Sequence, residues 1–251
     1  MTFKELHYQE NPLLLANVWD VPSTKVAERL GFQAVGTSSW AVAALLGYKD
    51  GENISFSELE FIVKRIAKNT NLPLSVDLES GYSRNPREIA EHIKRLANLG
   101  VVGINLEDSV SDDSRILLDA DDFAHTIKEI KAILKKGNID IFINVRTDSF
   151  LLGSPYATEE SKRRISLYEH AGADGIFVPC IQISSDIQEI VTSTKLPVNV
   201  LCMPDIPDFD TLNELGVKRI SMGNFLFDQM YSKYEKSTAL LLDQRSFKSV
   251  F

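Results

Sequence analysis

Two carboxylic acids come at the end of an apolar run in the first third of the chain. The run from Pro73 to Leu78 is rich in β-forming residues, and Asp77 and Glu79 lie just before Gly81. This pattern predicts a buried parallel strand that ends in a loop, with both carboxylates on one face. Two carboxylates held close together repel each other unless a proton or a cation lies between them. The predicted partner is a hard divalent cation, Mg²⁺ in the first place and Mn²⁺ as an alternative. A solvated acidic turn is the alternative to this metal site.

Other polar residues come at the ends of further apolar runs. Glu107 ends one run and Arg146 ends the next, and Ser38 and Ser39 follow an earlier one. Arg146 offers a planar fork for a substrate carboxylate, although a structural ion pair with one of the acids is the alternative. The backbone amides around Ser38 and Ser39 can hold a second carboxylate or an enolate oxygen. Adjacent residues of a regular strand point to opposite faces, so we expect Glu107 rather than Asp108 to enter the site.

The elements that must position these residues alternate along the whole chain. The predicted strands are Leu13–Val18, Ala34–Thr37, Leu74–Leu78, Val102–Leu106, Asp140–Val145, Gly175–Val178, Val198–Leu201 and Arg219–Met222, with helices between them. Such alternation predicts parallel pairing, and no Gly-rich dinucleotide or phosphate motif after the first strand supports an open sheet. We therefore predict an α/β fold, a single (β/α)8 TIM barrel over residues 1–251. Residues 38–53 are expected to form a long connection, and residues 108–119 a polar loop.

The composition excludes several classes of function. The net charge is −8 and the chain has no basic run, so we expect no nucleic-acid binding and no attraction to an anionic membrane. No apolar run is long enough to span a bilayer, and the N-terminus does not resemble a signal peptide. Cys180 and Cys202 form neither a disulfide framework nor a zinc spacing, which is typical of a reducing cytoplasm. Small buried thiols are the interpretation favoured for both.

The residues missing from the predicted strand ends narrow the chemistry further. None of the four histidines, His7, His92, His125 and His170, ends a predicted strand. This placement gives little support to a His-ligated zinc site or to a Ser–His–Asp nucleophile. No lysine ends a strand either, which weakens a Schiff-base mechanism; Lys49 in the connection after the second strand is the exception.

Eight short motifs occur in order along the chain. They are Ala16–Asp20, Thr37–Trp40, Leu46–Gly51, Val76–Tyr82, Ile104–Asp108, Asn144–Asp148, Ala171–Asp174 and Pro197–Val200. Together they resemble the isocitrate lyase/phosphoenolpyruvate mutase superfamily over nearly the whole chain. The likeness is greatest to its short members of the carboxyvinyl-carboxyphosphonate phosphorylmutase, or phosphonomutase, type.

The resemblance implies a Mg²⁺-dependent enzyme that cleaves or forms a C–C bond next to a pyruvate- or glyoxylate-like enolate. Its substrate would be a small 2-hydroxy or 2-keto carboxylate. Asp77 matches the direct metal ligand of the family, and Glu79 and Glu107 match partners that bind metal-bound water. The residues that the resemblance assigns to catalysis or substrate binding are Ser38, Ser39, Trp40, Asp50, Glu107, Arg146 and Asn199, with Asn199 on a distal carboxylate. The family also implies a homodimer or homotetramer in which the last helix is exchanged between subunits.

The segment after the fourth predicted strand departs from the family. Lyases of the family carry a gating loop there with a Cys that acts as general acid, whereas this chain has Ser109–Arg115 with no Cys, His or Lys. Ser109, Ser111 and Arg115 are the alternatives for its role. Two further hypotheses therefore stay open beside the C–C lyase. One is P–C bond chemistry by a phosphonomutase or phosphonopyruvate hydrolase, and the other is a non-catalytic barrel that binds a keto acid.

Overall fold

A closed barrel of parallel strands forms the centre of the computed structural model, which describes residues 1–111 and 114–251. The barrel strands are β1 (Leu13–Val18), β2 (Val35–Thr37), β3 (Leu74–Asp77), β4 (Val101–Glu107), β7 (Phe142–Arg146), β8 (Gly175–Val178), β9 (Val198–Leu201) and β10 (Arg219–Ser221). Their order around the barrel is β1-β10-β9-β8-β7-β4-β3-β2, and every neighbouring pair is parallel. The predicted (β/α)8 barrel is confirmed, and each strand boundary lies within two residues of its predicted position.

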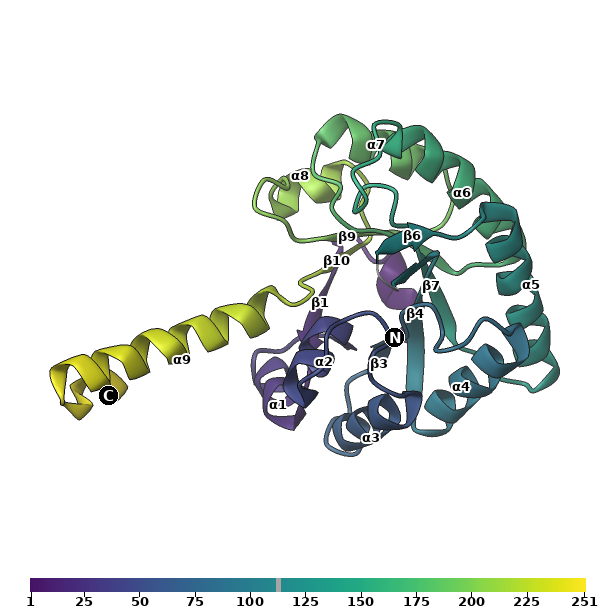
Figure 1. Cartoon of the computed structure of the whole chain (residues 1–251). Helices are drawn as coiled ribbons and strands as arrows, with labels where there is room; N and C mark the ends of the chain where they lie inside the picture. Colours follow the sequence, from purple (N-terminus) through teal and green to yellow (C-terminus); the bar gives the residue numbers. More distant parts are fainter. Residues whose placement is uncertain (112–113) are drawn as a thin grey trace.

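Helices α1 to α8 surround the barrel, whereas α9 extends away from it (Figure 1). The α-helices are α1 (Val21–Arg29), α2 (Ser39–Leu46), α3 (Phe56–Ala67), α4 (Pro86–Asn98), α5 (Ala120–Lys136), α6 (Ala157–Ala171), α7 (Ser184–Thr192), α8 (Phe209–Glu214) and α9 (Phe225–Gln244). Two short 3-10 helices, η1 (Glu5–Tyr8) and η2 (Phe247–Val250), lie near the chain ends. Among the helices of the described ranges, none combines the length and the apolar character needed to cross a membrane.

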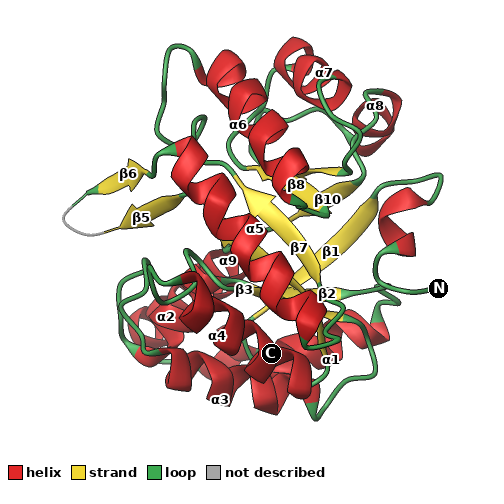
Figure 2. Ribbon diagram, turned by 90° about the vertical axis from the view of Figure 1, so that its right-hand side faces the viewer, coloured by secondary structure: helices red, strands yellow, loops and turns green. Residues whose placement is uncertain are grey.

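Two segments contain secondary structure where the sequence predicted connections. Helix α2 lies within residues 38–53 and begins after Ser38, whose side chain accepts a hydrogen bond from the Ala41 N–H at 3.4 Å. The segment after β4 forms a two-stranded antiparallel hairpin, β5 (Ser109–Ser111) and β6 (Arg115–Leu117) (Figure 2). Residues 112–113 between its strands lie outside the described ranges. Helix α2 is apolar apart from Ser39, and each strand of the hairpin is three residues long, so neither segment gives a clear periodicity in the sequence.

The barrel interior carries a layer of polar side chains at a level where TIM barrels usually pack branched apolar residues. Asn144 donates a hydrogen bond to Oδ1 of Asn105 at 3.0 Å and to Oδ1 of Asn199 at 3.1 Å. Arg219 is 1% exposed, and its Nη2 lies 3.3 Å from Asn105 Oδ1. Ser221 donates to Asn199 Oδ1 at 3.1 Å. These bonds connect β4, β7, β9 and β10 beneath the ends of the strands.

Helix α9 leaves most of its apolar residues uncovered. Phe227 is its one buried residue, and its ring packs edge-on against Trp19 with centroids 5.2 Å apart. The exposed apolar residues of this helix are Phe225, Leu226, Met230, Tyr231, Tyr234, Leu240 and Leu242. An apolar groove of about 350 Å³ runs between the start of α9 and helix α1. The exchange of this helix between subunits stays a prediction.

Candidate active site

A cavity of about 290 Å³ opens where the barrel strands end. Its wall includes Thr37 at the end of β2, Asp77 at the end of β3, Arg146 at the end of β7 and Ser221 at the end of β10. The C-terminal ends of parallel strands meet at one rim, so residues that are far apart in the sequence share this cavity. Its volume suits a small molecule rather than a polymer.

Asp50 and Asp77 both line this cavity with an unsatisfied carboxylate oxygen. The Oδ1 atom of each is buried and has no hydrogen-bond partner among the described residues. The Ser39 N–H donates to the other oxygen of Asp77, Oδ2, at 3.4 Å. Burial raises the pKa of Asp50, and the neighbouring Asp77 carboxylate raises it further. Because a buried carboxylate oxygen without a donor is costly, these two atoms favour a cation or a proton beside them.

Glu79 faces the loops around the cavity rather than its interior. Its carboxylate accepts the Glu52 N–H at 2.7 Å and the Tyr82 hydroxyl at 2.8 Å. Strand β3 ends at Asp77, and Glu79 has a positive φ of 50°, so the strand alternation that predicted one shared face for the two acids stops before it. Burial raises the pKa of Glu79 to about 7, with smaller contributions from Asp50 and Asp77.

Glu107 is held between two guanidinium groups. Its Oε2 lies 2.8 Å from Arg146 Nη1, and its Oε1 accepts a hydrogen bond from Arg115 Nη1 at 2.5 Å. The side chain is 3% exposed and lies beneath the wall of the cavity. Burial raises the pKa of Glu107, and the Arg146 charge opposes that rise. Oε1 is therefore hydrogen-bonded, whereas Oε2 contacts Arg146 as an ion pair and has no hydrogen-bond partner among the described residues.

Arg146 is oriented mainly by Asp148. Its Nε donates to Asp148 Oδ1 at 2.6 Å and its Nη2 donates to Oδ2 at 3.1 Å, a bidentate pair that fixes the plane of the guanidinium. The Ser109 hydroxyl also donates to Asp148 Oδ2. All three nitrogens of Arg146 thus contact acidic side chains of the protein. Arg146 forms the structural ion pair named as the alternative, and its role in binding a substrate carboxylate stays a prediction.

Asp108 points away from the cavity, as the strand alternation predicted. It accepts hydrogen bonds from the Tyr168 hydroxyl at 2.7 Å and from Arg164 Nη1 at 3.1 Å. Its other oxygen accepts the Asp148 N–H at 3.1 Å. This buried cluster ties helix α6 to the ends of β4 and β7 and so supports the position of Arg146.

The predicted substrate-binding residues divide into two groups. Ser38, Ser39 and Trp40 line the cavity around the N-terminus of α2, and Trp40 is exposed. Asn199 is 1% exposed and lies below the cavity, where its amide nitrogen donates to the Val200 and Arg219 carbonyls and to the Ser221 hydroxyl. The substrate roles of all four stay predictions, and Asn199 has its hydrogen bonds already satisfied within the barrel.

Sequence reasoning assigned no role in the site to several side chains that line the cavity, among them Cys180 and Asn105. Cys180 follows β8 with a positive φ of 64°, and burial raises the pKa of its thiol. Asn105 lies two residues before Glu107 on β4, so the two side chains point to the same inward face. This strand alternation is a signal that could have identified Asn105. Arg115, one of the three alternatives named for the segment after β4, also lines the cavity, and which of the three takes the general-acid role stays open.

Carboxyl groups outnumber guanidinium groups around the cavity. The carboxyl groups of Asp50, Asp77, Glu107 and Asp148 gather near the guanidinium groups of Arg115 and Arg146, and Glu79 lies beside Asp50 and Asp77. In residues 1–111 and 114–251, no three His, Cys, Asp or Glu side chains converge as a preformed ligand set. The predicted metal ligands Asp77, Glu79 and Glu107 do not form such a set, and their metal-binding roles stay predictions. The unsatisfied oxygens of Asp50 and Asp77 still fit a hard cation, because such an ion takes oxygen ligands and keeps several waters.

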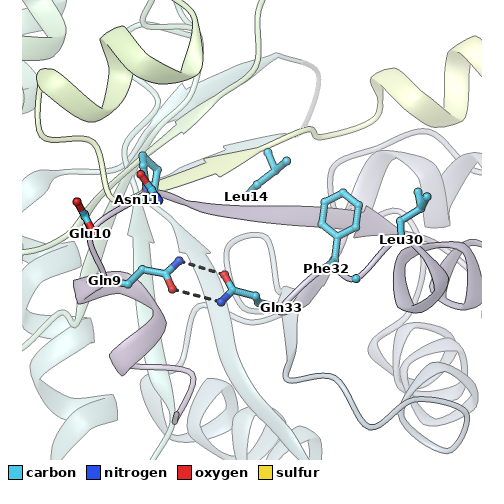
Figure 3. Close-up of a pocket in the computed structure, with 9 residues that line it drawn as sticks. Gln9, Glu10, Asn11, Leu14, Leu30, Phe32 and Gln33 are labelled. Carbon is cyan, nitrogen blue, oxygen red and sulfur yellow. Dashed lines mark hydrogen bonds between the residues drawn. The ribbon is translucent and has the colours of Figure 1, made fainter.

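A second pocket, of about 460 Å³, lies near the opposite end of β1 (Figure 3). Its amide side chains of Gln9 and Gln33 bond to each other at 3.1 and 3.3 Å, as the dashed lines show. Glu10 is its one ionisable lining residue. This pocket lacks the convergent charges of the strand-end cavity, so it is the weaker candidate for chemistry.

Comparisons with known proteins find similarity over nearly the whole chain. A family model described as phosphoenolpyruvate phosphomutase matches residues 3–242. An uncharacterized protein of Mycobacterium tuberculosis is 36% identical over 224 residues, which cover 89% of this chain and 82% of that protein. The oxaloacetate decarboxylase of Rhodopseudomonas palustris is 30% identical over 220 residues, covering 83% of this chain and 73% of the relative. The crystal structure of a candidate phosphonomutase from Burkholderia cenocepacia matches with a TM-score of 0.87 at 36% identity, over 96% of this chain and 97% of that one.

Proposed function

The chain belongs to the phosphoenolpyruvate phosphomutase family, and we propose that it is a metal-dependent enzyme of carbon–carbon bond cleavage or formation. The proposed substrate is a small 2-hydroxy or 2-keto carboxylate whose cleavage either passes through a pyruvate enolate or releases glyoxylate and leaves the carbanion on the other fragment. The similarity to an oxaloacetate decarboxylase supports this choice, because loss of CO₂ from a 2-keto dicarboxylate breaks such a bond. The small volume of the strand-end cavity also supports it.

The observation that carries the proposal is the pair of unsatisfied carboxylate oxygens on Asp50 and Asp77. We propose that these two residues hold a divalent cation, Mg²⁺ or Mn²⁺, directly. Glu79 would act from farther away, since protein donors already engage both of its oxygens. Glu107 would also act from farther away, because it lies beneath the cavity wall in ion pairs with Arg115 and Arg146. When bound, such a cation supplies Lewis-acid stabilisation of the negative charge that develops on the keto acid.

The protein's own groups have separate tasks in this proposal. The N-terminus of α2, with Ser39 and Trp40, directs its partial positive charge at the cavity, where it favours a carboxylate or an enolate oxygen. Arg146 places a fixed positive charge on the other wall. Among the described lining residues there is no His and no Lys. A proton for the departing carbanion would therefore come from water or from a hydroxyl or thiol group.

The test is a turnover assay on purified protein with and without Mg²⁺. Oxaloacetate, malate, citramalate, isocitrate and 2-methylisocitrate form the panel, and the release of pyruvate or glyoxylate is followed. We expect release with at least one acid, its loss in EDTA, and its loss in Asp50→Asn with Mg²⁺ present. Absence of keto acid release from every acid, at any metal concentration, contradicts the proposal. Tight binding of oxalate without any turnover would instead identify a non-catalytic keto-acid-binding barrel.

Chemistry on a P–C bond is the second candidate. It is favoured by the likeness to a candidate phosphonomutase, which is 36% identical over nearly the full length of both chains. Phosphorus NMR with phosphonopyruvate and Mg²⁺ separates the two functions, because only P–C chemistry moves the phosphonate resonance to that of a phosphate ester or of free phosphate.

We also propose that the protein is a homodimer or homotetramer in which α9 packs on a second copy. The exposed apolar residues of α9 and the adjacent apolar groove support this, since burial of such surface drives association. Multi-angle light scattering should give a multiple of 28.1 kDa. A monomer at micromolar concentration contradicts it.

A further inference from the structure

Asn105 presents a free amide nitrogen at the floor of the strand-end cavity. The residue lies on the inward face of β4, is 8% exposed and lines the cavity. Its Oδ1 accepts hydrogen bonds from Asn144 Nδ2 at 3.0 Å and from Arg219 Nη2 at 3.3 Å. In the part of the chain that the structure describes, no hydrogen bond uses its Nδ2. A nearly buried donor therefore faces the cavity without a protein partner.

The orientation of this amide follows from its neighbours in the barrel interior. A guanidinium can only donate, so the atom of Asn105 that faces Arg219 must be the oxygen. Asn144 Nδ2 makes the same demand, because its two hydrogens go to the Oδ1 atoms of Asn105 and Asn199. Asn199 is fixed in turn, since its nitrogen donates to the carbonyls of Val200 and Arg219. Turning the Asn105 amide over would set its nitrogen against two donors, so Nδ2 is held toward the cavity.

Arg219 is a buried cation with no acidic partner among the described residues. It is 1% exposed, and its one side-chain hydrogen bond within them goes to Asn105. Its Nε and Nη1 have no partner there. Burial lowers the pKa of Arg219 to about 9, which leaves the guanidinium charged at neutral pH. A positive charge beside the oxygen of the Asn105 amide polarises that amide and makes its Nδ2 a stronger donor.

Asp77 is the neighbour of Asn105 on the adjoining strand. The two residues are in register on β3 and β4, and Asp77 carries one of the unpartnered carboxylate oxygens of the cavity. Asn105 is unsuited to bind a cation there, because its oxygen is used in the interior and an amide N–H group offers no acceptor. Its Nδ2 needs an acceptor instead, and an anionic ligand oxygen beside the cation supplies one.

We propose that Asn105 binds the ligand by donating from Nδ2 to an anionic oxygen beside the cation, and that Arg219 is the positioning residue that orients it. This inference rests on the proposed function, in which Asp50 and Asp77 hold that cation. It adds a neutral donor at the floor of the cavity to the charged groups of its walls. During bond cleavage such a donor stabilises the oxygen on which negative charge develops.

The experiment separates binding of the anion from binding of the metal. Oxalate is the probe, because its planar oxygens resemble those of a pyruvate enolate. Isothermal titration calorimetry gives the Kd of Mg²⁺ alone, and the Kd of oxalate at saturating Mg²⁺, for wild type, Asn105→Asp and Asn105→Ser. Asn105→Asp changes only the free atom, since its other oxygen can still accept from Arg219 and Asn144. The matched control is Asn71→Asp, at an exposed position before β3 and thus at the opposite end of that strand from the cavity.

We expect Asn105→Asp to weaken oxalate binding by roughly 10- to 100-fold, the range of a hydrogen bond to a charged group. Its Mg²⁺ affinity should equal or exceed that of wild type, because a carboxylate beside Asp77 attracts the cation. Asn105→Ser should weaken oxalate binding by about 10-fold and change the Mg²⁺ affinity by less than about 3-fold. Asn71→Asp should change neither affinity. A fall of both affinities together in the Asn105 variants indicates a purely structural role and contradicts the proposal.

A crystal structure of wild type with Mg²⁺ and oxalate gives a measurement that does not depend on a variant. Nδ2 of Asn105 should lie within roughly 3.2 Å of an oxalate oxygen. The inference is overturned if bound oxalate leaves this nitrogen to water, if Asn105→Asp binds oxalate as well as wild type, or if wild type binds no oxalate. Keto acid release together with an unchanged oxalate affinity in Asn105→Asp refutes only the role of Asn105. The expected affinities without any release refute only the catalysis, so the two failures are distinguishable.

Discussion

The variant Asp77→Asn should be at least as stable as wild type without metal, and less stable than wild type when metal is added. Asp77 lines the cavity with a buried Oδ1 that has no partner in the described residues, and it raises the pKa of its neighbours Asp50 and Glu79. In EDTA, Asp77→Asn therefore removes a repelled buried charge while an amide oxygen can still accept the Ser39 N–H. We expect its melting temperature in EDTA to equal or exceed that of wild type.

Metal should stabilise wild type and leave the variant almost unchanged. A ligand at 100 times its Kd stabilises the folded state by about 2.7 kcal/mol. For a protein of about 250 residues, roughly 2–4 °C of melting temperature corresponds to each kcal/mol. Wild type should therefore melt roughly 5–10 °C higher with Mg²⁺ at that excess than in EDTA, and Asp77→Asn should shift by a small fraction of this.

The assay is differential scanning fluorimetry over a Mg²⁺ series, with the wild-type Kd measured by calorimetry. Glu91→Gln is the matched control, because Glu91 is an exposed acid on α4 that pairs with Lys94. Its metal-dependent shift should match that of wild type. The reasoning is refuted if Asp77→Asn shifts as much as wild type does, or if it melts well below wild type in EDTA.

Two further predictions concern buried charges away from the metal site. Arg164→Met should destabilise the protein by about 3–5 kcal/mol in urea unfolding, because it leaves the buried Asp108 carboxylate unpaired. The neighbouring exposed Arg163→Met should cost no more than about 0.5 kcal/mol, and equal costs would contradict the argument. Burial of His7 lowers its pKa from 6.5 to about 3, so the unfolded chain binds its proton first and the folded state loses stability as pH falls below 6.5. Relative to His7→Leu, wild type should lose about 1.4 kcal/mol per pH unit between pH 6 and 4, and His125→Leu, at an exposed position, should not change that slope.

The architecture could be predicted because its signal is local. Strands such as Gly175–Val178 and Val198–Leu201 are short apolar runs between turn and helix signals, and they form where the sequence places them. Eight such units fix a closed parallel barrel through the handedness of their connections. The strand ends that carry Asp77, Glu107 and Arg146 follow from this pattern, and so does the outward direction of Asp108.

The geometry of the site depends on interactions that no local pattern encodes. Glu79 leaves the expected face because its backbone turns to a positive φ. Its side chain is then held by the Glu52 N–H from the connection after α2 and by the Tyr82 hydroxyl of its own loop. Asn199 looks like a strand-end residue in the sequence, yet an interior network with Asn144 and Ser221 uses up its amide.

Arg115 shows most clearly what the sequence determines and what depends on tertiary structure. The sequence alone left it as one of three polar residues in a segment predicted to be a loop. Its contacts with Glu107 and Asp148 arise because a hairpin folds back over the ends of β4 and β7. Sequence thus determined which residues reach the rim of the barrel, since strand periodicity is local. Tertiary structure decided which of their hydrogen-bonding groups stay free for a ligand, since that depends on neighbours brought together from distant parts of the chain.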